Sequence, residues 1–216
     1  MADDAEDLVR AWDLLIGRHT ADPTAAATGR ALIASWAEPH RRYHALGHLR
    51  EVLTYVEEVA EHADDADAVR LAAWYHDAVY QGRPDDEERS AQRAEAELAA
   101  LGVQPSLVAE VARLIRVTVG HDPAAGDRNG EALCDADLAV LGAEPARYRA
   151  NTVAVRAEYA HVSDTDFRVG RARVVRGLLA APALFHTPLA RSRWESQARA
   201  NLDAELRSLE DGNAYG

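Results

Sequence analysis

The chain has 216 residues, 48% of them hydrophobic, so it is long enough and apolar enough to bury the core of one domain. The net charge of −12 argues against a surface for polymeric nucleic acid, and the absence of lysine among the 24 basic residues excludes Schiff-base and Walker-type lysine chemistry. A single cysteine forbids an internal disulfide, and neither an apolar signal core nor a run of about 18 apolar residues occurs, so we expect a cytoplasmic protein without a membrane span.

Apolar residues recur every three to four positions along almost the whole chain, which is the spacing of helices that bury one face. The predicted helices cover residues 8–18, 25–37, 48–62, 65–80, 86–102, 105–118, 132–141, 145–162 and 163–180, and a last one ends near 209. Pro105 suits a first helical position, and Asp85 or Asp86 can cap the start of the helix predicted for 86–102. The segment 122–130 is expected to be a loop.

No stretch alternates with a period of two, and we find no repeat, linker or low-complexity block. The predicted fold class is therefore all-α, a helical bundle that forms one domain over residues 1–216. Its core is expected to span about 36–209, with the helices of 1–35 packed on it and 211–216 frayed.

The stretch LAAWYHDAVY at 71–80 is apolar or aromatic except for two adjacent polar residues, His76 and Asp77. A buried aspartate costs several kcal/mol unless its charge is compensated, and a divalent cation held by imidazole and carboxylate is one compensator. The alternative is a hydrogen-bonded core histidine beside a paired aspartate. A second His-Asp pair, at 121–122, precedes a proline and indicates a helix end.

Further candidate ligands lie at one helix start and within one short helix. His48 ends the segment HRRYHALGH, at or just before a helix N-terminus, and CDADL contains Asp135 and Asp137. Residues two apart in sequence are rotated by about 200° around a helix axis, so only one of these aspartates can face a given ion. The helical wheel favours Asp137 modestly. Two imidazoles and two carboxylates suit one Mn²⁺, Fe²⁺, Co²⁺, Ni²⁺ or Zn²⁺, with Mg²⁺ as a further candidate, and leave positions for water and substrate.

The ordered pattern of a histidine, a His-Asp pair and a distant aspartate on helices resembles the HD-domain superfamily of metal-dependent phosphohydrolases. Eight segments resemble the successive blocks of one bacterial subgroup of predicted metal-dependent HD phosphohydrolases: RRYHALGHL, LAAWYHDAVY, DDEERSA, LIRVTVGH, CDADLAVLG, VRAEY, FRVGR and ESQARANLDAEL. The resemblance extends from about Trp36 to Leu209, and Asp86 departs from it where the subgroup pattern has asparagine.

The resemblance implies an HD-type helical bundle with the metal ligands His48, His76, Asp77 and Asp137. The expected activity is hydrolysis of a small phosphorylated metabolite, for example a nucleotide, by water activated on one divalent metal ion. Asp77 and Glu87 are the expected catalytic residues, Glu87 as a general acid or base; for Glu87 the alternative is charge complementarity at a helix start. No membrane partner is expected, and a homodimer is compatible with the sequence.

Supporting residues are expected to contact the substrate or to hold the ligands: His44, Thr118, His121, Asp135, Arg156, Glu158 and Tyr159. For His44 the alternative is a hydrogen-bonded core histidine. Arg156 or Arg171 could clamp a phosphate, whereas an ion pair with Glu158 is the favoured alternative. The four tryptophans are expected in the core, and Cys134 is read as a buried residue rather than a nucleophile.

Two other classes of function remain open at the level of sequence. One is a di-iron oxygenase of HD type, for which His44 and His121 are the only obvious extra ligands. The other is a non-catalytic module that binds a metal or a nucleotide in a regulatory role. Metal stoichiometry tests the first, and binding without turnover indicates the second.

Overall fold

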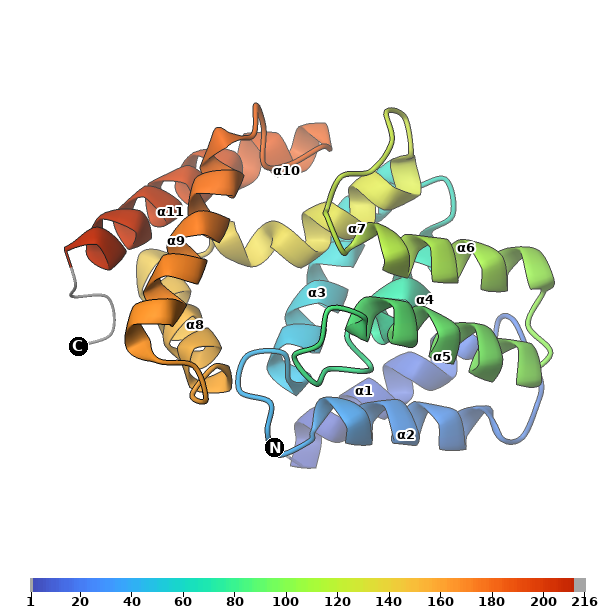
Figure 1. Cartoon of the computed structure of the whole chain (residues 1–216). Coiled ribbons are helices and arrows are strands. Elements are labelled where there is room, and N and C mark those ends of the chain that lie inside the picture. Colours follow the sequence, from blue (N-terminus) through green and yellow to red (C-terminus); the bar gives the residue numbers. More distant parts are fainter. Residues whose placement is uncertain (1, 212–216) are drawn as a thin grey trace.

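The computed structural model describes residues 2–211, with side chains from residue 6 onward, and this part of the chain is helical without any strand (Figure 1). The helices are α1 (Ala2–Ile16), α2 (Ala25–Trp36), α3 (Leu46–Val59), α4 (Ala66–Tyr75), α5 (Asp86–Ala100), α6 (Pro105–Val117), α7 (Arg128–Leu138), α8 (Pro145–Glu158), α9 (Asp164–Ala180), α10 (Pro188–Arg193) and α11 (Glu195–Glu210), with 3₁₀ turns η1 (Ala60–His62) and η2 (Ala139–Gly142). The predicted all-α fold class is confirmed. Of the segment expected to fray, 212–216 lies outside the described residues.

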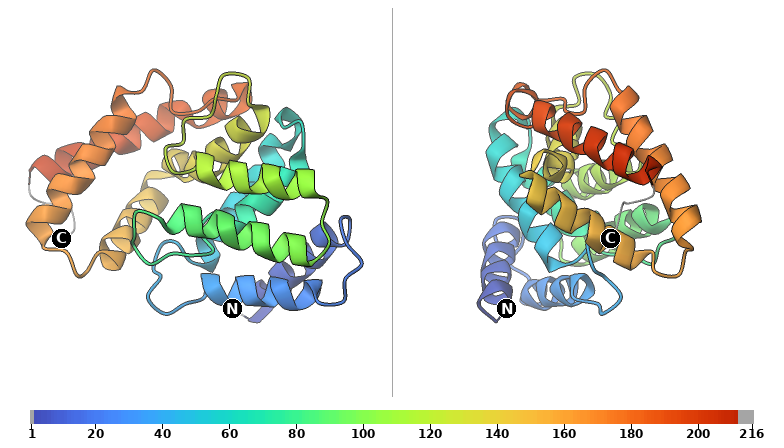
Figure 2. Two further views of the ribbon diagram at one scale, coloured as in Figure 1. Left: turned by 45° about the vertical axis from the view of Figure 1, so that its right-hand side comes forward. Right: turned by 90° about the vertical axis from the view of Figure 1, so that its left-hand side faces the viewer.

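The helices form two groups, which Figure 2 shows on opposite sides of the molecule. In the larger group α3, α4, α6 and α7 pack on one another, α5 covers α6, and the α1–α2 pair packs on α4 and α3. In the smaller group α9 and α10 pack on α11, and α8 and α11 contact η2, which continues α7. None of the described helices has the length and apolar character needed to cross a bilayer.

The core is centred on α4, whose residues 71–75 are all buried. Two tryptophans from α1 and α2 pack against it: the indole of Trp12 donates to the carbonyl of Ala25 at 2.8 Å and lies 5.4 Å from the ring of Trp74, and the indole of Trp36 donates to the carbonyl of Trp74 at 3.0 Å. All four tryptophans are at most 5% exposed, which confirms their predicted place in the core. The buried indole N–H groups of Trp12 and Trp36 thus have the hydrogen-bond partners that burial requires.

The helix predicted for 65–80 ends at Tyr75, five residues early. Carbonyl groups beyond that point accept hydrogen bonds from the fully buried side chain of Arg41, whose Nη1 donates to Asp77 O at 2.8 Å and whose Nη2 donates to Ala78 O at 3.3 Å. The prediction was wrong here because these carbonyl groups accept from Arg41 and not from the backbone amides of a continued helix. The spacing of apolar residues within 65–80 carries no information about that arginine.

Smaller differences concern other helix ends. Helix α7 begins at Arg128, inside the predicted loop, because the Asp127 side chain accepts from the Gly130 amide at 3.0 Å and caps it. The last predicted helix corresponds to α11, which ends at Glu210, and the short helix α10, which was not predicted, precedes it. By contrast Pro105 and Ser163 stand at the helix starts predicted for them.

Candidate metal centre

Three of the predicted ligands converge where α3, the end of α4 and α7 meet. His48 Nε2 lies 3.1 Å from Asp137 Oδ1 and 3.4 Å from His76 Nε2, and His76 Nε2 lies 3.6 Å from Asp137 Oδ1. Donor atoms about 2.0 to 2.2 Å from one ion are separated by roughly 3 to 3.5 Å in tetrahedral or octahedral geometry. The three donor atoms therefore have the spacing that a single divalent ion requires.

Asp77 is the outermost member of the predicted set. Its Oδ2 lies 3.3 Å from His76 Nε2 and 3.9 Å from His48 Nε2, but it is not part of the group whose ligand atoms all lie within 4.8 Å of one another. The structure thus brings all four predicted ligands together, with Asp77 beside the two imidazoles.

The early end of α4 allows two neighbouring residues to face the same point. Consecutive side chains on a helix diverge by about 100°, so His76 and Asp77 would point in different directions from inside a regular helix. His76 is the C-cap residue of α4, with its amide donating to Ala72 O at 2.8 Å, whereas Asp77 follows it in the turn, and His76 Nε2 lies 3.3 Å from Asp77 Oδ2. The Arg41 contacts that stop the helix therefore also shape the site.

Hydrogen bonding fixes the tautomer of one imidazole. His76 Nδ1 lies 2.8 Å from the carbonyl oxygen of Ala73, so the proton belongs on Nδ1 and the lone pair of Nε2 faces the cluster. His48 is also buried, and its Nδ1 has no hydrogen-bond partner among the described residues. Two buried imidazoles therefore direct Nε2 toward a shared point, as neutral metal ligands do.

The electrostatics of the cluster favour a positive charge. Burial alone would lower the pKa of His76, but the carboxylates of Asp77 and Asp137 outweigh it and raise that pKa well above its usual range. Burial likewise opposes ionisation of the two aspartates, yet the neighbouring imidazoles lower the pKa of each. Either a proton on His76 or a bound cation compensates the negative charge of the two carboxylates, so these residues fit a metal ion.

The two aspartates of CDADL face different parts of the protein. Asp137 Oδ2 lies 2.7 Å from His121 Nε2, and its other oxygen faces the histidine pair. Asp135 is fully buried and accepts from the backbone amides of His186 and Thr187, each at 2.7 Å, just before α10. Asp135 thus holds α10 onto α7 and does not contact the cluster.

The cluster lies in a cavity of about 330 Å³ between the two groups of helices, hereafter the metal cavity. Glu87, Thr118 and His121 line it, as predicted for residues near the site. Glu87 is partly exposed and has no hydrogen-bond or ion-pair partner among the described residues, whereas the Thr118 hydroxyl donates to Ile115 O at 2.7 Å. Glu87 is therefore the carboxylate available to a bound molecule.

His44 also lines the metal cavity and is held by Glu158. His44 Nδ1 lies 2.7 Å from Glu158 Oε2, and Glu158 Oε1 accepts from the amides of Arg42, Tyr43 and His44 at 2.8 to 2.9 Å. The ring of His44 stacks on Tyr80 with centroids 4.2 Å apart. Burial would raise the pKa of Glu158, but the hydrogen bonds from His44 and the amides lower it to about 2.

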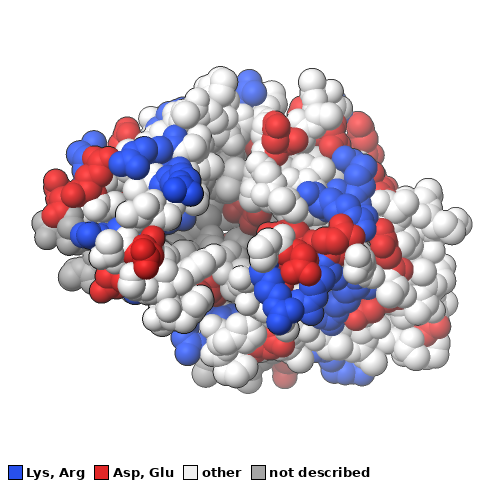
Figure 3. Space-filling view, in the orientation of Figure 1, with Lys and Arg blue, Asp and Glu red and all other residues white. Residues whose placement is uncertain are grey.

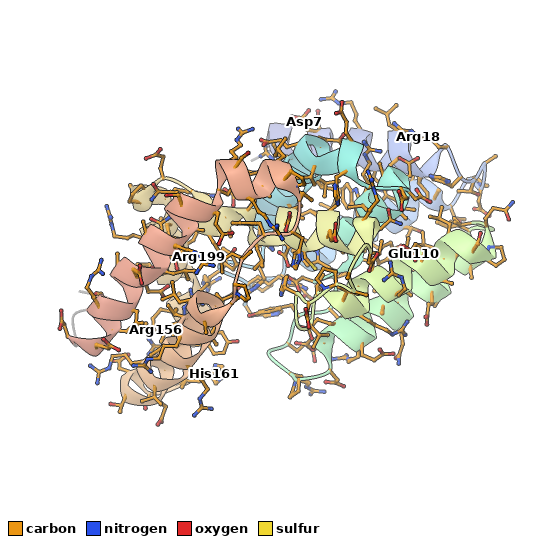
Figure 4. All side chains as sticks on the ribbon, turned by 90° about the horizontal axis from the view of Figure 1, so that it is seen from above. Asp7, Arg18, Glu110, Arg156, His161 and Arg199 are labelled. Atoms are coloured by element: carbon orange, nitrogen blue, oxygen red, sulfur yellow. The ribbon has the colours of Figure 1, made fainter. Side chains whose placement is uncertain are left out.

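Two predicted residues lie away from the metal cavity. Arg156 forms an ion pair with Asp164, with Nη2 at 2.5 Å from Oδ1, so its expected pairing with Glu158 was wrong. Figure 4 shows Arg156 at the outer end of the α8–α9 pair, near His161. Tyr159 is 37% exposed and lines a neighbouring cavity instead.

Sequence reasoning missed Asn151, which lines the metal cavity from α8. Its buried Nδ2 has no acceptor among the described residues, so an amide donor is available to a bound molecule. The apolar wall of the same cavity, from Val155 and Leu178, was also missed. Neither feature has a local motif, because helices far apart in the chain create the surface.

Comparisons of the chain with protein-family models, with curated proteins and with solved structures find no match.

Proposed function

We propose that the chain is an HD-type metal-dependent phosphohydrolase that acts on a small phosphorylated metabolite with one divalent metal ion. The observation that carries the proposal is the convergence of His48 Nε2, His76 Nε2 and Asp137 Oδ1 within 3.1 to 3.6 Å at a cavity. The Asp77 carboxylate lies beside them. When bound, the ion would acidify a water molecule and offset charge on a phosphoryl oxygen.

The chain's own residues supply the remaining roles. Glu87, which has no hydrogen-bond or ion-pair partner among the described residues, would accept or return a proton. Asn151 Nδ2 offers a hydrogen bond to a phosphoryl or ester oxygen. His121 holds Asp137 by its second oxygen, which keeps Oδ1 directed at the imidazoles.

Metal analysis combined with a phosphate-release assay tests the proposal. The protein is purified without added metal, stripped with a chelator, and reloaded separately with Mn²⁺, Fe²⁺, Co²⁺, Ni²⁺, Zn²⁺ or Mg²⁺ before exposure to sugar phosphates and nucleotides. We expect hydrolysis that requires reloading and disappears in Asp137→Asn. Hydrolysis that survives in that variant, or in stripped protein, contradicts the proposal.

The oxygenase alternative requires a second set of ligands. His121 contacts Asp137 and His44 contacts Glu158, so each spare histidine already has a carboxylate partner. Elemental analysis that finds two irons per chain in place of one metal ion supports the oxygenase.

A further inference from the structure

A second cavity of about 500 Å³, hereafter the side chamber, adjoins the metal cavity between α8 and α9. The two cavities share a wall formed by Tyr43, His44, Val155, Arg171 and Val174. A molecule bound at the metal cavity can therefore extend into the side chamber. In Figure 3 the surface is hollowed between the α8–α9 side and the α5–α6 side.

The lining of the side chamber is mostly apolar and aromatic. Tyr159, Val162 and Phe167 form its far wall, and Val174 lies at its junction with the metal cavity. Tyr159 is 37% exposed and Val174 is 52% exposed, although both are large hydrophobic residues. Exposed apolar side chains that gather in a concave surface mark a binding site more often than isolated ones do.

The charged residues of the side chamber already have partners. Arg171 forms a two-point ion pair with Glu205, with contacts of 2.8 and 3.0 Å. Asp166 accepts from the Ser163 hydroxyl at 2.7 Å, and its negative charge disfavours an anion. The chamber therefore suits an uncharged group and offers little to a second phosphate.

We propose that the side chamber binds the uncharged aromatic alcohol portion of a phosphomonoester whose phosphate lies in the metal cavity. The inference rests on the proposed phosphohydrolase function and specifies its substrate class. Hydrolysis breaks the ester bond to phosphorus, water supplies the new oxygen on phosphate, and the aromatic alcohol leaves with a proton. The ring of Tyr159, 37% exposed and 5.6 Å from the buried ring of Phe167, provides the aromatic surface of the chamber.

Two glycines of α9 provide a matched pair of variants. Gly170 lines the side chamber, and a Cβ added there meets nothing within 4 Å, so Gly170→Leu fills the chamber without a backbone clash. Gly177 lies two turns further along the same helix, is equally open, and lines neither of the two cavities. Both variants replace a helical glycine, so they differ chiefly in what the new side chain blocks.

The metal-loaded wild type and both variants are assayed on 1-naphthyl phosphate and on glycerol 1-phosphate. We expect Gly170→Leu to lower kcat/KM for 1-naphthyl phosphate at least tenfold and to change kcat/KM for glycerol 1-phosphate less than threefold. Gly177→Leu should behave as wild type on both. Equal effects of Gly170→Leu on the two esters overturn the inference.

Binding of 1-naphthol, measured by its fluorescence without metal, separates this inference from the proposed function. We expect the wild type and Gly177→Leu to bind it and Gly170→Leu to bind at least tenfold more weakly. If neither ester is hydrolysed but this binding pattern holds, the phosphohydrolase proposal fails while the aromatic subsite stands. Absence of 1-naphthol binding to the wild type overturns the subsite itself.

Discussion

Asp135 and Asp137, two residues apart on α7, have different surroundings. We expect Asp137→Asn to lose the bound metal, because Oδ1 faces both imidazoles and an amide is a much weaker ligand. We expect Asp135→Asn to keep the metal but to lose about 1 to 3 kcal/mol of stability, because it accepts from the amides of His186 and Thr187.

Elemental analysis and urea unfolding of the two variants, side by side, measure both effects. Each substitution is the other's control, since both remove one carboxylate from the same helix. Metal retained by Asp137→Asn and lost by Asp135→Asn would reverse the assignment.

Glu158 is predicted to make stability depend on pH. Its pKa falls from an ordinary 4.5 to about 2 on folding, so its contribution is present above about pH 4.5 and is lost as pH falls toward 2. Glu158→Gln cannot titrate, so it lacks this contribution at every pH. The stability advantage of the wild type over this variant should therefore shrink as pH falls.

Urea unfolding of the wild type and Glu158→Gln at about pH 6, 4.5 and 3.5 measures that difference. A constant difference across the three values would show that the carboxylate charge is not what stabilises the 42–44 segment.

Sequence alone pointed to the residues that converge at the candidate site but not to the contacts that hold them. His76 and Asp77 were recognisable because they are the only polar residues of an apolar run. The contact between Glu158 and the amides of 42–44 joins segments more than 110 residues apart, so no local pattern reports it. The same is true of Arg41, which ends α4 through carbonyls 36 and 37 residues away.

At the scale of elements, helix existence was predictable and some helix ends were not. Ends marked by Ser163 and Pro105 were found because their side chains act locally. The end of α4 depends on tertiary contact, and that end brings His76 and Asp77 together. The error in the predicted end of this helix thus falls at the candidate site, where tertiary contacts override the local preference for helix.

The packing of α2 on α1 depends on the missing side chain of Gly29. A Cβ there would lie 2.2 Å from Cδ1 of Trp12, whose ring is fully buried. We expect Gly29→Ala to destabilise by about 1 to 2 kcal/mol, because overpacking outweighs the helix-propensity gain. Gly177→Ala, in open space on α9, should instead stabilise by about 0.5 to 1 kcal/mol.

The denaturant midpoints of the two variants, compared with that of the wild type, show whether each substitution stabilises or destabilises the protein. A stabilised Gly29→Ala would mean that the Trp12 ring moves aside at little cost.

At the scale of the whole molecule, the metal cavity is formed between the two groups of helices. The larger group supplies the polar end through α3, the end of α4 and α7, while α8 and α9 supply Asn151 and the apolar wall. Hydrophobic spacing predicted the helices but not which faces meet across the cavity. The polar end was therefore predictable from sequence, whereas the apolar wall from α8 and α9 was not.

The candidate ligands also connect distant parts of the chain, since His48 and Asp137 belong to α3 and α7 and His76 follows α4. An ion bound to all three would join these elements in the folded state and bind the unfolded chain weakly. At a free ion concentration about 100 times Kd, this linkage adds about 2.7 kcal/mol, or roughly 5 to 10 °C in Tm for a chain of this size.

We therefore expect the Tm of chelator-stripped protein to rise with added Mn²⁺ or Zn²⁺ and to saturate at one ion per chain. Asp137→Asn should show little or no such rise, whereas Asp135→Asn should show a rise from a lower starting Tm, because it retains the ligands. Thermal unfolding over a metal titration of the three proteins gives the comparison. An equal rise in Asp137→Asn would locate the stabilising ion elsewhere, since surface carboxylates can bind cations weakly without a buried imidazole pair.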